Sequence, residues 1–309
     1  KAIERQHGLL IERAKGIYSF SHLTFQEYLA AKFMCERRCW GWLAINTAHK
    51  PWRELLIMSC ELANDEELLL EIEQQINSVI AKHEGIRSLC SWSSEAASAS
   101  ERKKEATANR VAALAIAYIL CFIYPFLYGH AKSRPYMKAK AGYNAYVLTN
   151  AISFAHSCVR TLSEASLSLN LTNFSMSFSN AYGYGIEYYP EAIKRVADFL
   201  HQISRTDYMN CINVDRVLIR NALSETSIDE HTREGRGFGE YEESFRHLYN
   251  IFLTALSVDA ELIDLASEEL ESLYDLLYST QLLADCINRS PLRCTPIVRH
   301  IQQRLLLSE

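Results

Sequence analysis

Ten histidines are the side chains of this sequence best suited to acid–base or metal chemistry near neutral pH. They are His7, His22, His49, His83, His130, His156, His201, His231, His247 and His300. The sequence contains no H-E-x-x-H pair, which would place two zinc ligands on one helix face, and no G-x-S-x-G nucleophile turn. The sequence therefore predicts no catalytic residue in this chain, and a free-standing hydrolase is only an alternative.

The cysteines are an odd number and include no C-x-x-C pair. They are Cys35, Cys39, Cys60, Cys90, Cys121, Cys158, Cys211, Cys286 and Cys294. Cys35 and Cys39 are one helical turn apart, but no second pair at ligand spacing accompanies them, so we predict no metal site. Most of the others lie in apolar stretches, where a free cysteine acts as a small hydrophobic residue. The pattern predicts free thiols and a cytoplasmic location.

His22 is the histidine whose setting suggests a binding role. An imidazole can donate to a phosphate oxygen, and a charge-assisted bond of this kind contributes roughly 1.5–3 kcal/mol. From spacing alone, a buried histidine packed at the start of a helix is the simpler interpretation. The following residues, Thr24-Phe25-Gln26-Glu27, fit a capping box, so a helix is expected to begin there.

The elements around His22 are predicted to be a hairpin and a helix. Leu9–Ser21 holds two short apolar runs, with Gly16 at the turn between them. Apolar residues then recur at helical spacing from Phe25 to Phe33, and we expect both phenylalanines to lie in the core. A short hairpin followed by a helix is the arrangement found at the end of a winged-helix domain.

The rest of the chain is predicted to be mainly helical. Helices are expected at 52–62, 66–83, 145–163, 190–203, 214–223, 241–256, 260–287 and 296–307. Residues 91–108 are rich in serine, alanine and lysine and suggest a loop or a solvated helix start. Alternation in 167–178 leaves helix and strand both open. The glycines of the charged segment 230–243 follow no apolar strand, so they indicate a flexible connection and not a phosphate cradle.

Val111–Tyr128 carries no charge and reaches the lower limit of length for a membrane span. It follows the basic residues Arg102, Lys103, Lys104 and Arg110. Its small side chains, its internal proline and the absence of another such segment favour a buried core helix. A single span is the alternative.

Composition excludes several classes of function. At 309 residues and 49% hydrophobic content, the chain can form one large domain or two smaller ones. A net charge of −5 gives no general attraction to nucleic acid or anionic lipid. The helix expected at 24–38 has Lys32, Arg37 and Arg38 only in its second half, whereas a groove-reading helix is basic along its exposed face. A winged-helix nucleic-acid-binding regulator therefore stays an alternative.

Gly8–Phe33 resembles the end of the winged-helix domain in NACHT proteins, a branch of the STAND signalling NTPases that includes the NOD-like receptors. The motif F-x-H-x-T-F-Q-E-Y-x-A-A is matched from Phe20 to Ala31. Three further anchors, Pro51–Leu56, Leu282–Asn288 and Leu305–Leu307, resemble the helical C-terminal region of a bacterial NACHT subgroup. The chain begins at Lys1 without an initiator methionine, so we interpret it as part of a longer polypeptide.

The resemblance implies a fold and a domain plan. The fold class is expected to be mainly α, with a winged-helix end (a short β-hairpin plus a helix) followed by a multi-helix bundle. Residues 1–49 would be the C-terminal part of the winged-helix domain. Residues 50–309 would be a helical sensor and regulatory domain, with an internal break at 225–240 as an option.

The resemblance also implies a nucleotide switch. In NACHT proteins the winged helix closes over ADP in an upstream NTPase domain, and by position His22 would contact the phosphates. No G-x-x-x-x-G-K-[ST] loop occurs here, so ADP or ATP with Mg is expected in that upstream domain and no cofactor in this chain alone. A trigger, such as a phage or cellular protein, would release the closed state and allow homo-oligomerisation, plausibly in bacterial anti-phage defence.

Overall fold

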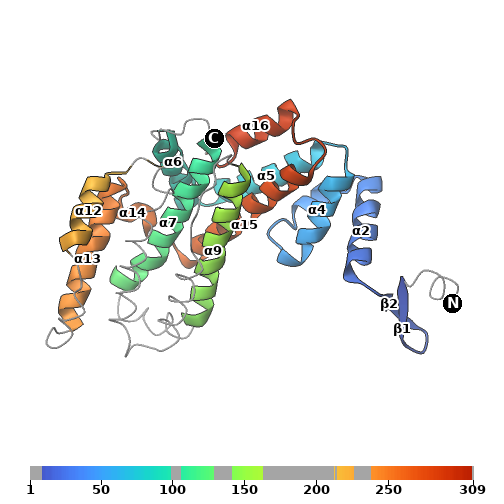
Figure 1. The fold of residues 1–309 in the computed structure, drawn as a ribbon, viewed down its shortest axis with the longest axis horizontal. Helices are drawn as coiled ribbons and strands as arrows, with labels where there is room; N and C mark the ends of the chain where they lie inside the picture. Colours follow the sequence, from blue (N-terminus) through green and yellow to red (C-terminus); the bar gives the residue numbers. More distant parts are fainter. Residues whose placement is uncertain are drawn as a thin grey trace. The chain divides into compact units, whose positions relative to one another are not determined.

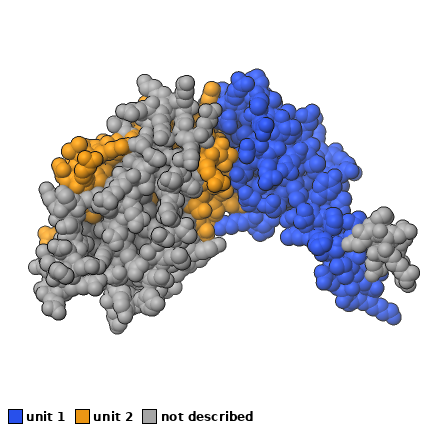
Figure 2. Space-filling model, in the orientation of Figure 1, with its two compact units in different colours: residues 1–76, 282–302 blue, residues 77–281, 303–309 orange. Residues whose placement is uncertain are grey.

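A computed structural model describes residues 9–98, 106–128, 141–162, 212, 214–225 and 238–307. The described residues form one hairpin followed by a series of helices (Figure 1), so the predicted mainly α fold is confirmed. The chain divides into two compact units, residues 1–76 with 282–302 and residues 77–281 with 303–309 (Figure 2). Residues 167–178, the helix expected at 190–203 and residues 230–237 of the predicted connection lie outside the described residues. Residues 238–243, the rest of that predicted connection, are helical instead.

The hairpin consists of β1 (Leu10–Ala14) and β2 (Ile17–Phe20), paired antiparallel. Gly16 has a φ of +79°, a left-handed conformation that glycine adopts without steric cost. Its N–H donates to the Glu12 carboxylate at 2.8 Å, which closes the turn. The predicted wing hairpin is therefore confirmed, with glycine at its turn.

Unit 1 is helical after the hairpin. Its elements are α2 (Leu23–Arg37), α3 (Trp40–Ala44), the 3-10 helix η1 (Lys50–Trp52), α4 (Arg53–Leu62), the first ten residues of α5 (Glu67–Lys82), the end of α15 (Ser267–Arg289) and most of α16 (Pro296–Arg304). Leu43 and Leu56 from the N-terminal part are completely buried, as are Leu283 and Val298 from the C-terminal part. One core is thus built from the two ends of the described chain.

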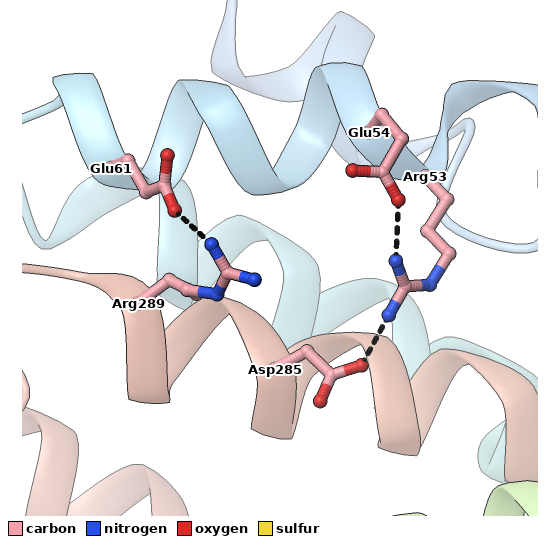
Figure 3. Close-up of polar contacts among 5 residues, drawn as sticks. All are labelled: Arg53, Glu54, Glu61, Asp285 and Arg289. Carbon is pink, nitrogen blue, oxygen red and sulfur yellow. Dashed lines mark hydrogen bonds and ion pairs between the residues drawn. The ribbon is translucent and has the colours of Figure 1, made fainter.

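Ion pairs join α4 to α15 within unit 1 (Figure 3). Arg53 lies 2.7 Å from Asp285, and Arg289 lies 2.8 Å from Glu61. Arg53 and Asp285 belong to two of the segments that carried the sequence resemblance, and Arg289 directly follows the second of them. Segments separated by most of the chain therefore meet.

Unit 2 surrounds a long apolar helix. Besides the end of α5, this unit contains α6 (Glu84–Ser98), α7 (Ala106–Tyr128), α9 (Ala141–Leu162), α12 (Arg216–Glu225), α13 (Phe238–Ala255), α14 (Ala260–Ile263) and the first part of α15. The long apolar helix is α7. Helix α7 packs against α6, α9 and α14, and each side chain from Val111 to Cys121 is at most 5% exposed. The interpretation of this segment as a buried core helix is confirmed for these residues. In the part of the chain that the structure describes, no helix is both long enough and hydrophobic enough to cross a membrane.

Two helix predictions need correction. Residues 91–98, expected in a loop or solvated helix start, form the second half of α6 and bury Trp92 and Ala97. The single helix expected at 260–287 is broken at Asp264, whose ψ of 65° ends α14, and α15 begins at Ser267. The helices expected at 52–62, 66–83, 145–163, 214–223, 241–256 and 296–307 are confirmed, with ends displaced by a few residues.

Candidate functional site

His22 connects the hairpin to α2 and occupies the N-cap position of that helix. Its backbone is extended, with φ −132° and ψ 140°, and its carbonyl accepts the N–H of Phe25 at 3.2 Å. The helix begins at Leu23, so Thr24 lies inside the first turn, and the N-cap side chain makes no capping hydrogen bond. The predicted capping box is therefore wrong.

The His22 side chain is exposed, which also contradicts the alternative of a buried packing histidine. Its ring lies beside that of Phe25, with centroids 5.9 Å apart. Just before it, the Ser21 hydroxyl is buried without a hydrogen-bond partner among the described residues. Contact between His22 and a nucleotide stays a prediction.

The start of α2 has the electrostatic properties of an anion site. The first turn of a helix presents unpaired N–H groups and the positive end of the helix dipole. No acidic side chain lies in this first turn to neutralise it. An imidazole at the N-cap adds a donor, so a phosphate placed here could bind both side-chain and backbone donors.

Uncovered apolar side chains are concentrated around His22. Of thirteen large hydrophobic side chains that are exposed among the described residues, eight lie between residues 11 and 33. They are Ile11, Ile17, Tyr18, Leu23, Phe25, Tyr28, Leu29 and Phe33. Scattered exposed hydrophobic residues are normal, but a concentration of this kind marks an interaction surface.

Phe25, Leu29 and Phe33 form the centre of this surface, and we call them the apolar row. Residues four apart lie on one side of a helix, so these three follow one another along α2. They are 39%, 46% and 55% exposed. The expectation that Phe25 and Phe33 lie in the core is wrong for this chain.

The opposite side of α2 explains why the apolar row is left uncovered. Helix α2 packs on α4 through Ala31, which is fully buried, and through the Cys35 thiol, which donates to the Ser59 carbonyl at 3.5 Å. Small residues here let the two helices approach closely. Helical spacing predicts which residues of α2 share a face. Only the tertiary structure shows that the face with the smaller side chains is the buried one.

The Cys35–Cys39 pair is not part of a metal site in the described residues. No group of three histidine, cysteine or acidic side chains there is arranged to hold a metal ion. Burial, together with the negative charge of Glu36, raises the pKa of the Cys35 thiol, although the Ser59 side chain acts in the opposite sense. A thiol of this kind stays protonated at neutral pH.

A comparison with protein families gives one match. The family described as "Winged helix-turn-helix domain C-terminal to NACHT" matches residues 1–34, the segment that ends within α2. No curated protein and no solved structure matches the chain. The match therefore covers the hairpin, His22 and the apolar row.

Proposed function

We propose that this chain, which carries the winged-helix region of a NACHT-family protein at residues 1–34, is the regulatory and sensor region of a NACHT-type signalling NTPase. In this proposal α2 and the hairpin dock on an upstream NTPase domain of the same polypeptide. Docking keeps the enzyme closed around ADP, and a trigger that binds the helical region releases it. Released chains then self-associate.

The uncovered apolar row beside His22 is the observation that carries this proposal. Complete burial of a leucine or phenylalanine side chain contributes about 1.5–3 kcal/mol, and the three side chains of the row keep roughly half of their area exposed. A partner that covers the row and the hairpin therefore gains several kcal/mol, on the order of what one or two hot-spot residues contribute to an interface. The matched family is described as C-terminal to NACHT, which supports an upstream NTPase domain as the partner in this proposal.

His22 supplies the nucleotide sensitivity in this proposal. A partner domain docked on the apolar row places its own bound nucleotide near the start of α2, where the imidazole and the first-turn N–H groups can donate to a phosphate. ADP or ATP, with Mg, would be held mainly by the upstream domain, since this sequence contains no phosphate-cradling loop. A contact made only in the closed state biases the switch toward that state.

The trigger, the location and the biological role are further parts of the proposal. A protein trigger, from a phage or from the cell, suits a large helical region, and the described cysteines are free thiols, in keeping with a reducing cytoplasm. A role in antiviral defence follows only from the likeness to bacterial NACHT proteins. Homo-oligomerisation is the expected output.

Direct DNA reading is less well supported. Arg38 is occupied by two carboxylates, Asp65 and Glu67, and Arg37 stacks on Phe33 at 5.6 Å. Two of the three cations that could have contacted phosphates are therefore engaged within the chain. A shift of duplex DNA by the chain at low salt would support the alternative.

The test uses the complete polypeptide with its upstream domain. His22→Ala should weaken ADP binding about ten- to hundredfold, which corresponds to the loss of a charge-assisted hydrogen bond. Leu29→Ser should increase self-association without ligand, measured by size-exclusion chromatography with light scattering. Val217→Ser, at a 65% exposed position of α12, is the matched control and should change neither. Unaltered ADP affinity in His22→Ala, together with unaltered assembly in Leu29→Ser, would refute the proposal.

A further inference from the structure

Helix α2 ends at a residue that is unusual for its backbone conformation. Arg38 has φ 50° and ψ 46°, in the left-handed region where glycine is normally found. The N–H of Arg38 donates to Cys35 and the N–H of Cys39 donates to Met34, the hydrogen-bond pattern that closes a helix C-terminus. This conformation is less favourable for arginine than for glycine. The role of the Arg38 side chain therefore needs an explanation.

The Arg38 side chain reaches the beginning of α5. Its Nη2 atom lies 2.5 Å from Asp65 Oδ2 and 2.8 Å from Glu67 Oε2. The second carboxylate oxygen of Asp65 accepts the N–H of Glu67 at 3.0 Å, so the Asp65 side chain is held against the first residue of α5. One cation thus joins the end of α2 to the start of α5.

This ion pair is too exposed to be explained by stability alone. The side chains of Arg38, Asp65 and Glu67 are 64%, 27% and 54% exposed. Exposed pairs of this kind shift an opening equilibrium by only about two- to fivefold, and salt screens them. The Arg38 ion pairs contribute little to stability, yet Arg38 keeps a disfavoured backbone conformation. This combination fits a contact between α2 and α5 that breaks and re-forms.

We propose that Arg38 is a regulatory joint that couples the helical region to α2, an inference that rests on the proposed function of α2 as a nucleotide latch. At about 1.5 Å per residue, the 15 residues of α2 carry a displacement of Arg38 about 22 Å to His22. Residues 67–76 of α5 belong to unit 1 and 77–82 to unit 2. A change in α5 can therefore reach the apolar row and His22 through the Arg38 ion pairs.

Hydrogen exchange on the 309-residue chain tests the joint directly. Arg38→Gln removes the charge but keeps a long side chain in the left-handed position, and Glu67→Gln removes one acceptor. Each should accelerate exchange of the α2 amides about two- to fivefold at low salt, and the double variant should add little to the larger single effect. The difference should disappear near 1 M salt.

Lys32→Gln is the matched control, because it removes the positive charge of another exposed residue of α2 without changing helix propensity. It should leave exchange unchanged. Additive effects of Arg38→Gln and Glu67→Gln, or an equal effect of Lys32→Gln, would overturn the coupling.

The regulatory part is measured in the complete polypeptide as the rate of ADP dissociation. Arg38→Gln should change this rate about two- to fivefold, and His22→Ala should change it more. If His22→Ala acts and Arg38→Gln does not, the joint has no regulatory role and the inference is refuted. If exchange shows the coupling but neither variant alters ADP dissociation, the joint is structural, and the nucleotide function fails separately.

Discussion

Arg53 of α4 and Asp285 of α15 are 232 positions apart in the chain, and their side chains form an ion pair at 2.7 Å (Figure 3). Arg53 also donates to Glu54 at 2.6 Å. Burial opposes the charge of the guanidinium, but its hydrogen bonds and the charges of both acids outweigh burial and raise the pKa of Arg53. The first and last parts of the described chain are thereby joined in unit 1.

Asp285→Asn should destabilise unit 1 by about 1 kcal/mol, because the pair is only partly exposed and its loss leaves Arg53 with one acidic partner. Urea unfolding followed by circular dichroism measures this change. Glu54→Gln is the control, since its side chain is 52% exposed and its effect should stay within about 0.5 kcal/mol. Equal losses in the two variants would show that the contact between α4 and α15 has no special weight.

Glu269 should matter far more than its neighbour Glu268. One oxygen of the Glu269 carboxylate accepts the N–H of Gly85 at 3.1 Å and the other accepts the N–H of Ala266 at 3.2 Å. It therefore satisfies unpaired donors at the starts of both α6 and α15. We expect Glu269→Ala to cost about 1–3 kcal/mol in the free energy of unfolding.

Glu268→Ala provides the comparison for that prediction. Its carboxylate is 75% exposed and pairs only loosely with Lys82 at 3.5 Å, so the loss should be below about 0.5 kcal/mol. Similar unfolding midpoints for the two alanine variants would contradict the double capping role.

Ser257→Gly should stabilise the chain. Ser257 follows α13 with a φ of 53°, and its N–H donates to Thr254 while that of Val258 donates to Leu253. Glycine adopts this conformation without the steric cost of a Cβ atom, so a gain of about 0.5–1 kcal/mol is expected. Thermal unfolding measures the gain, and Ser257→Ala, which keeps the Cβ, should show none.

Alkaline pH should weaken the fold through Cys90. Burial raises the pKa of this thiol from 9.0 to about 12, although the charge of Arg110 acts in the opposite sense. Below pH 9 the thiol is protonated in both the folded and the unfolded state, so its full contribution to the free energy of unfolding is present. Between pH 9 and 12 only the unfolded thiol ionises, so stability falls by up to about 1.4 kcal/mol per pH unit.

Urea unfolding at pH 8 and pH 10.5 measures that loss. Other buried thiols contribute in the same direction, so the comparison uses Cys90→Ala, whose stability should fall less steeply over this interval than that of the unchanged chain. Parallel pH profiles of the two proteins would show that Cys90 does not titrate as its burial requires.

Thiol labelling at neutral pH should divide the described cysteines by accessibility. Cys294 is exposed and should react first, which Cys294→Ser would remove. Cys35 and Cys39 are partly exposed and should follow slowly. Five buried cysteines should react only in urea: Cys60, Cys90, Cys121, Cys158 and Cys286. Mass spectrometry of labelled peptides identifies the order, and early labelling of any of these five would contradict the described cores.

Local sequence signals predicted the secondary-structure elements near the candidate site more accurately than they predicted which residues of those elements are buried. The hairpin followed from Gly16 between two apolar runs, because its turn needs a left-handed residue and this requirement is local. Whether Phe25 and Phe33 are buried or exposed could not be predicted in the same way. Helical spacing shows which residues share a face, whereas the packing partner decides which face is covered.

The segment after Ser91 shows a second limit. Its serines suggested a loop, since a hydroxyl competes with the backbone for hydrogen bonds. In α6 the hydroxyls of Ser93 and Ser94 instead donate to the Cys90 carbonyl at 2.8 and 2.9 Å, so both are satisfied within the helix. The burial of Trp92 then gives this stretch a packing face.

Partners across long sequence separation were beyond prediction as well. The sequence contains many acidic residues that could pair with Arg38, and nothing in its spacing selects Asp65 and Glu67. The same is true of Arg110, whose guanidinium donates to the carbonyls of Gln303 and Leu305. Such contacts depend on how whole helices pack.

The burial of α7 has a consequence for protein synthesis. Its apolar residues leave the ribosome well before α14, which packs against it, is made. At about 5–20 residues per second, the roughly 130 residues between the end of α7 and the start of α14 take about 7–26 seconds. During that time the nascent chain presents an apolar helix that α14 does not yet cover, the kind of segment that a chaperone holds until the rest of unit 2 is translated.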